Sequence, residues 1–175
     1  YSQGCYCGAF DNRLTSSGSY QPQDCITEYF LTIPTAAVAM VTNSRYGWGN
    51  NTSTEGSSQY YDKQFFDAIW GEDITLAGPV NRDSKEDCIP YISERQNRWC
   101  YYQINLFGDP TLDFWTSAPQ TMTVNHPAAV LIGSPTFQVQ VPGVQNARVC
   151  LSINGVIHGT GFTDAGGNCR LTITE

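Results

Sequence analysis

The stretch "TAAVAMVTN" (residues 35–43) says most about the fold of this 175-residue chain. Its middle, Ala36 to Val41, consists only of apolar residues and shows no polar alternation. Pro34 precedes the stretch and a polar turn follows it. A strand without alternation is typical of a sheet that is covered on both faces. The stretch therefore predicts a buried strand in a layered domain.

Helix-like and strand-like segments alternate around this strand. Residues 24–33 begin with an acidic residue and carry apolar residues at a helical spacing. Residues 57–71 repeat an aromatic or aliphatic residue at every fourth position and predict the strongest helix. Residues 98–109 have the character of another strand. The order predicts an α/β layered domain with a largely parallel sheet.

The pattern changes near Pro119, where the apolar period becomes two. The alternating segments are residues 136–141, 147–153 and 169–175. Asn154-Gly155 between two of them is a hairpin signal. Short alternating strands joined by glycine-rich turns predict a small all-β sandwich of immunoglobulin type. We therefore expect two domains, residues 1–118 and 119–175.

Composition excludes several classes of partner. Apolar residues make up 41% of the chain, which supplies a core, and the net charge is −7. Nucleic acids and anionic membranes bind through a basic face, so neither is an expected partner. No apolar run approaches the roughly 20 residues that a membrane-spanning helix needs.

The cysteines predict an exported protein. The seven lie at positions 5, 7, 25, 88, 100, 150 and 169. With two histidines and no paired C-x-x-C spacing, a structural metal is not expected. Disulfides in a secreted or cell-surface protein fit better, and three would leave one thiol free. Cys150 and Cys169 are the natural pair after Pro119, although the parity of Cys150 leaves this pairing open. No cofactor is expected, and calcium binding is left open.

Cys5, in "YSQGCYCGAF" (residues 1–10), allows two interpretations. Most cysteines belong to disulfides or simply pack. The alternative is a nucleophilic thiolate at the carboxyl end of a parallel strand, where open α/β sheets place their active sites. Gly4 and Gly8 would let a substrate approach the backbone, and N–H groups there could stabilise an oxyanion.

Several segments, taken in order, resemble the gingipain family of cysteine endopeptidases, which have a caspase-like fold. "SQGCYCGAF" (2–10) resembles the segment around the catalytic cysteine, and "AVAMVTNSRYGWG" (37–49) the next strand with its asparagine- and tryptophan-bearing loop. "GSSQYYDKQFFDAI" (56–69) is similar to the following helix and "INLFGDPTLDFWT" (104–116) to the closing strand. The part from Pro119 onward resembles the immunoglobulin-like domain that follows the protease.

The resemblance implies that Cys5 is the nucleophile of a secreted endopeptidase acting on polypeptides. It also implies that Gly4, Asn43 and Trp48 bind substrate. Trp48 takes the place of an aromatic wall in the pocket for the substrate's first side chain. Plain packing of Trp48 is the alternative.

The resemblance also implies how the other cysteines are used. Cys7 is released to pair with Cys25, and Cys88 pairs with Cys100, which leaves the nucleophile free. Asp109, before a proline, is expected to be a turn residue rather than a catalytic one.

The catalytic base is missing from this pattern. A thiol with an ordinary pKa near ~8.5 needs a base or a positive neighbour to act as a nucleophile at neutral pH. In the gingipain family the base is a histidine upstream of the cysteine, whereas His126 and His158 have the character of surface residues. We expect the base and the acidic residue that sets specificity in an upstream half of the same domain, so Tyr1 is expected to follow a processing site or an undetermined portion.

A rival interpretation comes from a different class of protein. The chain could be a catalytically inactive extracellular structural or adhesive protein that retains the peptidase fold. The absent base, the extra Cys7 so close to Cys5, and the aromatic, weakly charged composition favour it. A disulfide at Cys5 would remove the nucleophile and decide for this alternative.

Overall fold

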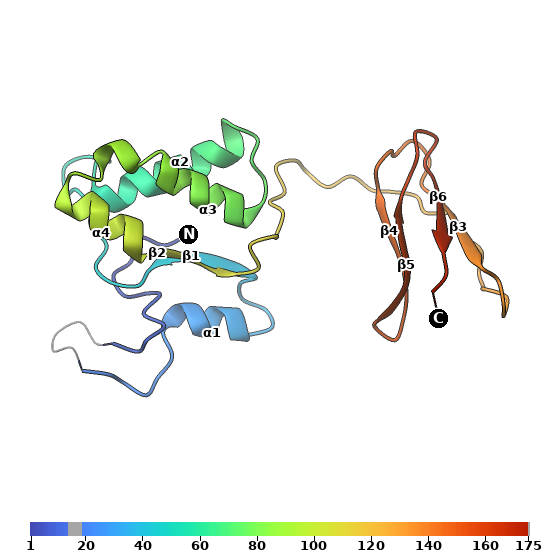
Figure 1. The fold of residues 1–175 in the computed structure, drawn as a ribbon, viewed down its shortest axis with the longest axis horizontal. Coiled ribbons are helices and arrows are strands. Elements are labelled where there is room, and N and C mark those ends of the chain that lie inside the picture. Colours follow the sequence, from blue (N-terminus) through green and yellow to red (C-terminus); the bar gives the residue numbers. More distant parts are fainter. Residues whose placement is uncertain (14–18, 175) are drawn as a thin grey trace. The chain divides into compact units, whose positions relative to one another are not determined.

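A computed structural model describes residues 1–13 and 19–174 of the chain. They form two compact units, Tyr1–Ala118 and Pro119–Glu175. The first unit contains α1 (Ile26–Thr32), β1 (Ala39–Asn43), α2 (Ser57–Trp70), α3 (Ala77–Glu86), a short 3-10 turn (Ile89–Tyr91), α4 (Arg95–Gln103) and β2 (Ile104–Gly108). Helix α1 lies on one face of the β1–β2 pair and helices α2 to α4 lie on the other (Figure 1). Within the described residues, no helix has the length and apolar character to cross a membrane.

The strand predicted over residues 35–43 is confirmed only for its second part, β1, whereas Ala36 and Val38 of the apolar run precede the strand and are exposed. The prediction of a largely parallel sheet is wrong for the β1–β2 pair. Strand β2 pairs with β1 in antiparallel register, with Val41 opposite Leu106. Among the described residues, the parallel pairing that the structure shows is the bridge between Ser2 and Thr42, at β1. Helices α2, α3 and α4 and the 3-10 turn separate β1 from β2 along the chain, and β2 runs back along β1 in the opposite direction.

The prediction of a strand over residues 98–109 is correct only for its second half. Residues up to Gln103 belong to helix α4, and only Ile104–Gly108 form a strand. The buried side of α4 consists of Asn97, Cys100 and Gln103, which recur at intervals of three. Because two of these buried residues are polar, apolar periodicity could not reveal the helix.

The two predicted helices are both confirmed. Helix α2 ends at Trp70 with Gly71 at its C-cap, and its buried side includes Tyr61 and Phe65. Helix α1 begins after Cys25, whose N–H donates to the Glu28 carboxylate at 2.8 Å. The apolar residues that suggested α1 are exposed by 41–51%, namely Ile26, Tyr29, Phe30 and Ile33.

The second unit follows the predicted period of two. Its strands are β3 (Thr136–Gln140), β4 (Arg148–Ile153), β5 (Val156–Phe162) and β6 (Asn168–Thr172). β3 pairs with β6 and β4 with β5, both antiparallel. Asn154 and Gly155 join β4 to β5 with φ values of 51° and 82°, which is the backbone of a tight hairpin turn. Two separate two-stranded pairs do not establish an immunoglobulin-like sandwich, so that assignment stays a prediction.

The predicted disulfides do not form in this structure, where all seven cysteines are free thiols. In the second unit the geometry explains why. Cys169 is buried with Leu171, whereas Cys150 is exposed on the alternate face of β4. Because neighbouring side chains on a strand point to opposite faces, Cys150 points away from the core that contains Cys169.

Candidate active site

Cys5 lies where the N-terminal segment passes the carboxyl end of β1. The N–H of Ser2 donates to the Val41 carbonyl at 2.9 Å, so the segment runs alongside β1 in the same direction. Cys5 comes three residues later and is exposed. Its Sγ accepts a hydrogen bond from the Gly47 N–H at 3.3 Å and lies 3.8 Å from the Gly47 carbonyl oxygen, to which it can donate. An exposed thiol is therefore held by backbone groups 42 residues away in the sequence.

The residue after Cys5 has an unusual backbone conformation. Tyr6 has a φ of 57°, in the left-handed region that residues other than glycine rarely adopt. Its N–H donates to the Arg45 carbonyl at 2.8 Å, and its ring meets the Tyr46 ring edge-on at 5.1 Å. These contacts hold the turn in which Cys5 sits, and strained backbone of this kind clusters at functional sites.

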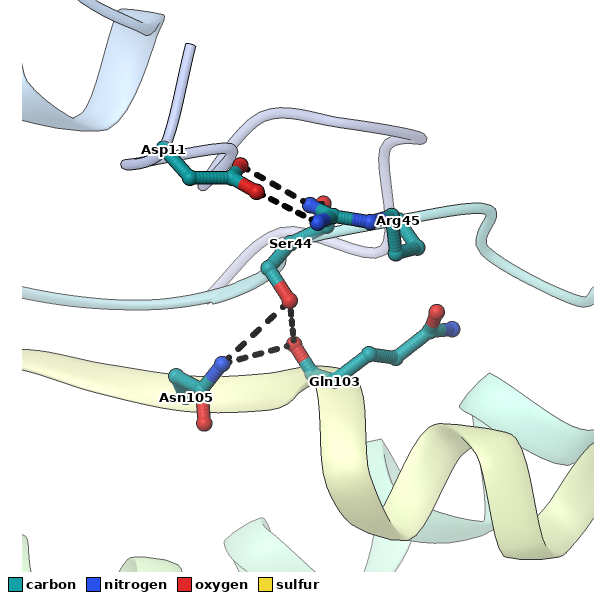
Figure 2. Close-up of polar contacts among 5 residues, drawn as sticks. All are labelled: Asp11, Ser44, Arg45, Gln103 and Asn105. Atoms are coloured by element: carbon teal, nitrogen blue, oxygen red, sulfur yellow. Dashed lines mark hydrogen bonds and ion pairs between the residues drawn. The ribbon is translucent and has the colours of Figure 1, made fainter. Parts of the chain in front are cut away.

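The loop of residues 44–48, which carries Gly47, is anchored at its start (Figure 2). The Ser44 hydroxyl donates to the Gln103 carbonyl at 3.2 Å. Arg45 contacts both carboxylate oxygens of Asp11, at 3.1 and 2.6 Å. This hydrogen-bonded guanidinium lowers the pKa of the Asp11 carboxyl, so the pair stays ionised at neutral pH.

The same loop is anchored at its end by the first turn of α2. The Trp48 N–H donates to the Ser58 hydroxyl at 3.0 Å, and the Ser58 N–H donates to the Trp48 carbonyl at 2.8 Å. Between the two anchors, the side-chain amide of buried Gln103 donates to the Tyr46 carbonyl. The N–H that reaches Cys5 therefore belongs to a loop fixed on both sides.

Gly47 has no room for a side chain. A Cβ at this position would lie 2.1 Å from the Gln3 carbonyl oxygen and 3.1 Å from Nδ2 of Asn43. The first contact is with backbone and cannot be relieved by a side-chain rotation. Glycine at position 47 is thus what lets the loop approach the Cys5 segment closely.

The residues predicted to bind substrate take different positions. Gly4 packs tightly, since a Cβ there would lie 2.5 Å from Cys7 Sγ, and its N–H donates to the Ser2 hydroxyl at 3.2 Å. Asn43 is only 1% exposed and lies behind the loop, with its Nδ2 unpartnered within the described part of the chain. Trp48 is 40% exposed and faces a cavity.

Asp109 has the turn role predicted for it. Its Oδ1 accepts hydrogen bonds from the N–H of Thr111 at 2.8 Å and from the Thr111 hydroxyl at 2.7 Å.

Burial distinguishes Cys5 from most other thiols of the chain. Desolvation raises the pKa of the Cys25 and Cys100 thiols and raises the pKa of Cys88 to about 12. Thiols with raised pKa values stay protonated and unreactive at neutral pH. Cys5 and Cys150 are the two cysteines that the structure exposes.

Neither histidine lies in the first unit. His126 Nδ1 lies 2.9 Å from the Pro127 carbonyl oxygen and His158 Nδ1 lies 3.0 Å from that of Thr174, and both histidines are in the second unit. Residues 1–118 contain no histidine. These residues therefore supply a thiol without an imidazole base.

One acidic cluster has the spacing of a metal site. Glu72, Asp83 and Asp87 each offer an oxygen, and these oxygens lie within 4.8 Å of one another. Exposed acidic groups often gather without an ion, so the cluster by itself is not assigned as a metal site.

The sequence did not single out several residues that build the site. Arg45, Gln103 and Ser58 fix the loop, and Gly47 meets Cys5. Glycine between two aromatic residues, in "YGW" (46–48), is the one local signal that a close approach was required. Arg45, Gln103 and Ser58 form their hydrogen bonds with residues that are distant in the sequence, so no local pattern indicated them.

Comparisons with known proteins identify a family and a fold. The sequence profile of peptidase family C25 matches residues 1–115. A crystal structure described as the Arg-specific cysteine proteinase gingipain R (RgpB) is similar at a TM-score of 0.62 and 18% identity, over 89% of this chain and 36% of that one. A complex of the pro- and mature domains of RgpB from Porphyromonas gingivalis is similar at 0.62 and 19%, over 98% and 38%. No curated protein matches significantly.

At these identities the solved structures establish the fold, and the chain spans less than two fifths of their length. The profile covers about two thirds of the chain and establishes the family.

Proposed function

Because the chain belongs to peptidase family C25, we propose that it supplies the nucleophile of a cysteine endopeptidase. The observation that carries this proposal is the exposed Cys5 thiol, held 3.3 Å from the Gly47 N–H at the carboxyl end of β1. The tight packing around Gly47 supports it, because a site that needs a fixed nucleophile gains from a loop that cannot move.

The reaction follows from ordinary thiol chemistry. The Cys5 thiolate attacks the carbonyl carbon of a peptide bond, the C–N bond breaks, and the amine leaves with a proton from the protonated base. Water then hydrolyses the thioester and restores the thiol. The N–H groups of Gly4 and Tyr6 already have acceptors, so we assign the Cys5 N–H as an oxyanion donor from this part of the chain.

The base is a histidine that residues 1–118 do not contain. The proposal places it in an upstream part of the same protease domain, which is then the first partner of this chain. In this arrangement Gly4 and Trp48 contact the polypeptide substrate, and Asn43 supports them from behind the loop. The second unit, as an immunoglobulin-like domain, supports the protease domain.

A covalent label tests the proposal. The native protein that contains this chain is treated with a peptide-based acyloxymethyl ketone, which alkylates a thiol only when it is bound as a substrate, and the label is mapped by mass spectrometry. We expect one adduct, on Cys5, and no adduct in Cys5→Ser. Hydrolysis of a casein substrate is expected to disappear in the same variant.

Cys150 provides the matched control, since it is also exposed but lies on a strand of the second unit. Iodoacetamide should label both cysteines, whereas the peptide-based reagent should label Cys5 alone. Cys150→Ser should leave hydrolysis unchanged. Equal labelling of both by the peptide reagent, or a Cys5 disulfide in the native protein, would favour the inactive structural alternative.

An extracellular or cell-surface location is part of the proposal and is supported by the sequence composition alone. Fractionation of the producing cells tests it. Recovery of the protein in the cytoplasm would contradict it.

A further inference from the structure

The buried thiol of Cys100 lies between two side chains that hold the loop of residues 44–48. Ser58 holds the end of this loop and Gln103 holds its middle, and we call these two residues the loop supports. The Cys100 sulfur is 3.4 Å from the Ser58 hydroxyl oxygen and 3.8 Å from Nε2 of Gln103. One sulfur atom therefore contacts both loop supports.

The Ser58 hydroxyl uses the Cys100 sulfur to fix its own direction. Its oxygen accepts the Trp48 N–H at 3.0 Å, so its proton is left for another acceptor. Among the described residues, the Cys100 sulfur lies within reach of that proton. A serine hydroxyl rotates to suit its partners, so donation to the sulfur keeps a lone pair directed at the Trp48 N–H.

The Gln103 amide is directed in the same way. Its Nε2 carries two hydrogens and has three acceptors around it, namely the Tyr46 carbonyl, Asn43 Oδ1 and the Cys100 sulfur. An amide turned by half a rotation would place its oxygen against all three acceptors. The sulfur therefore favours the orientation in which the amide nitrogen faces the loop.

These contacts lie in the interior of the first unit, where water does not replace them. Cys100 is 0% exposed, Ser58 is 1% exposed and Gln103 is 5% exposed. Burial raises the pKa of the Cys100 thiol, so the thiol stays protonated at neutral pH. A polar group that loses its partner in the interior is left unsatisfied, which is costly. The loop supports therefore depend on the sulfur and not on solvent.

Cys88 is a matched thiol that lacks these contacts. It is 1% exposed and belongs to the same hydrophobic cluster as Cys100. Among the described residues, the sulfur that forms hydrogen bonds with the loop supports is that of Cys100 and not that of Cys88. The two cysteines thus share their burial and differ in their polar contacts.

We propose that Cys100 is a positioning residue for the nucleophile Cys5. Its sulfur holds the loop supports, and these hold the loop whose Gly47 N–H donates to the Cys5 sulfur. The effect on catalysis rests on the proposed peptidase function. The inference assigns Cys100 as a free thiol, whereas the family resemblance implied a disulfide between Cys88 and Cys100.

Three variants test the positioning role in the native protein that contains this chain. Cys100→Ala removes the sulfur, and kcat/KM for casein should fall roughly 5- to 10-fold. Cys100→Ser keeps a group that can bond to both loop supports and should restore kcat/KM to within about threefold of the original value. Cys88→Ala should leave kcat/KM unchanged, although both alanine variants should lower the melting temperature by a similar amount.

Hydrogen exchange separates this inference from the proposed function, because it requires no activity. The Trp48 N–H donates to the Ser58 hydroxyl and exchanges faster when this support loosens. We expect its exchange to rise roughly 5- to 10-fold in Cys100→Ala, to return toward the original rate in Cys100→Ser and to stay unchanged in Cys88→Ala. This pattern favours the inference even if the native protein hydrolyses nothing.

Four results would overturn the inference. Equal effects of Cys100→Ala and Cys88→Ala on activity and exchange would show that both thiols only fill the core. Failure of Cys100→Ser to restore what Cys100→Ala loses would exclude a role for hydrogen bonding at this position. A disulfide between Cys88 and Cys100, found by peptide mapping of the non-reduced native protein, would show that the sulfur is not free to hold the loop supports. Unchanged exchange of the Trp48 N–H in Cys100→Ala would overturn the inference even if the native protein is an active peptidase.

Discussion

The two units of this chain bury different kinds of side chain. Among the described residues nine polar residues are buried, and eight of them belong to the first unit. Three of these, Asn43, Ser44 and Gln103, form or support the start of the loop that meets Cys5. The second unit is built around Phe137, Val139, Val141, Cys169 and Leu171, with Thr163 as its one buried polar residue in the described part.

This difference shows how a site is built on a fold. Apolar alternation needs only the right face to be buried, so many hydrophobic residues of suitable size would serve. A buried amide or hydroxyl requires a partner at a fixed distance and direction, since a lost hydrogen bond in the interior is costly. The first unit therefore fixes the position of one thiol, whereas the second unit shows no comparable set of placed polar groups among its described residues.

The largest effect is expected from Gly47→Ala, which breaks the close approach in the first unit. The new Cβ would lie 2.1 Å from the Gln3 carbonyl oxygen, so the loop and the Cys5 segment must separate. A displacement of about 1 Å at a catalytic group costs roughly 100-fold in rate. The measurement is kcat/KM together with the rate of Cys5 alkylation by the peptide-based reagent.

Gly49→Ala is the matched control for this prediction. A Cβ at Gly49 would meet nothing within 4 Å, so we expect activity close to that of the unchanged protein. Similar losses in both variants would mean that the loop tolerates no substitution, and the specific contact with Gln3 would not be the cause.

The second prediction tests whether the second unit is stabilised by its alternating apolar core. Leu171 is 1% exposed and pairs with Phe137 across β6 and β3. Leu171→Ala leaves a cavity and should lower the free energy of unfolding of this unit by about 2–5 kcal/mol. Hydrogen exchange of the β3 and β6 amides measures it. Thr172→Ala, at the exposed neighbouring position, should cost less than about 1 kcal/mol. An equal effect of both would contradict a core based on alternation.

The smallest effect concerns charge in the first unit. Burial and the nearby Asp87 and Glu86 carboxylates raise the pKa of Asp83, and its Oδ2 has no partner within the described residues. The folded state therefore binds the proton more tightly than the unfolded state, so ionisation of Asp83 destabilises the fold above its raised pKa. Asp83→Asn should raise the melting temperature at pH 7 by roughly 1–3 °C.

The pH dependence of the rise in melting temperature tests whether the ionisation of Asp83 is its cause. The difference between the two proteins should shrink as the pH falls and vanish below about pH 3, where Asp83 is protonated in both the folded and the unfolded state. A difference that persists below about pH 3 would assign the gain to new hydrogen bonds of the asparagine. Asp73→Asn, at an exposed position, should change the melting temperature less.

The sequence by itself determined the local elements whose signal is apolar and repetitive. The run before Asn43 predicted β1, intervals of four predicted α2, and intervals of two predicted the strands β3, β4 and β6. Asn154-Gly155 predicted the hairpin turn. These signals succeed because burial of an apolar face depends only on spacing along the chain. The order of four segments also identified the family that the profile establishes.

Only the tertiary structure decided the direction of the sheet, the helix α4, and the surroundings of Cys5. Helix α4 was hidden because its buried side is made of Asn97, Cys100 and Gln103. The contact between Cys5 and Gly47 joins residues 42 apart, and the Gln103 amide reaches Tyr46 from 57 residues away. Hydrogen bonds of this kind depend on distance and angle in space, and no pattern of neighbouring residues encodes them.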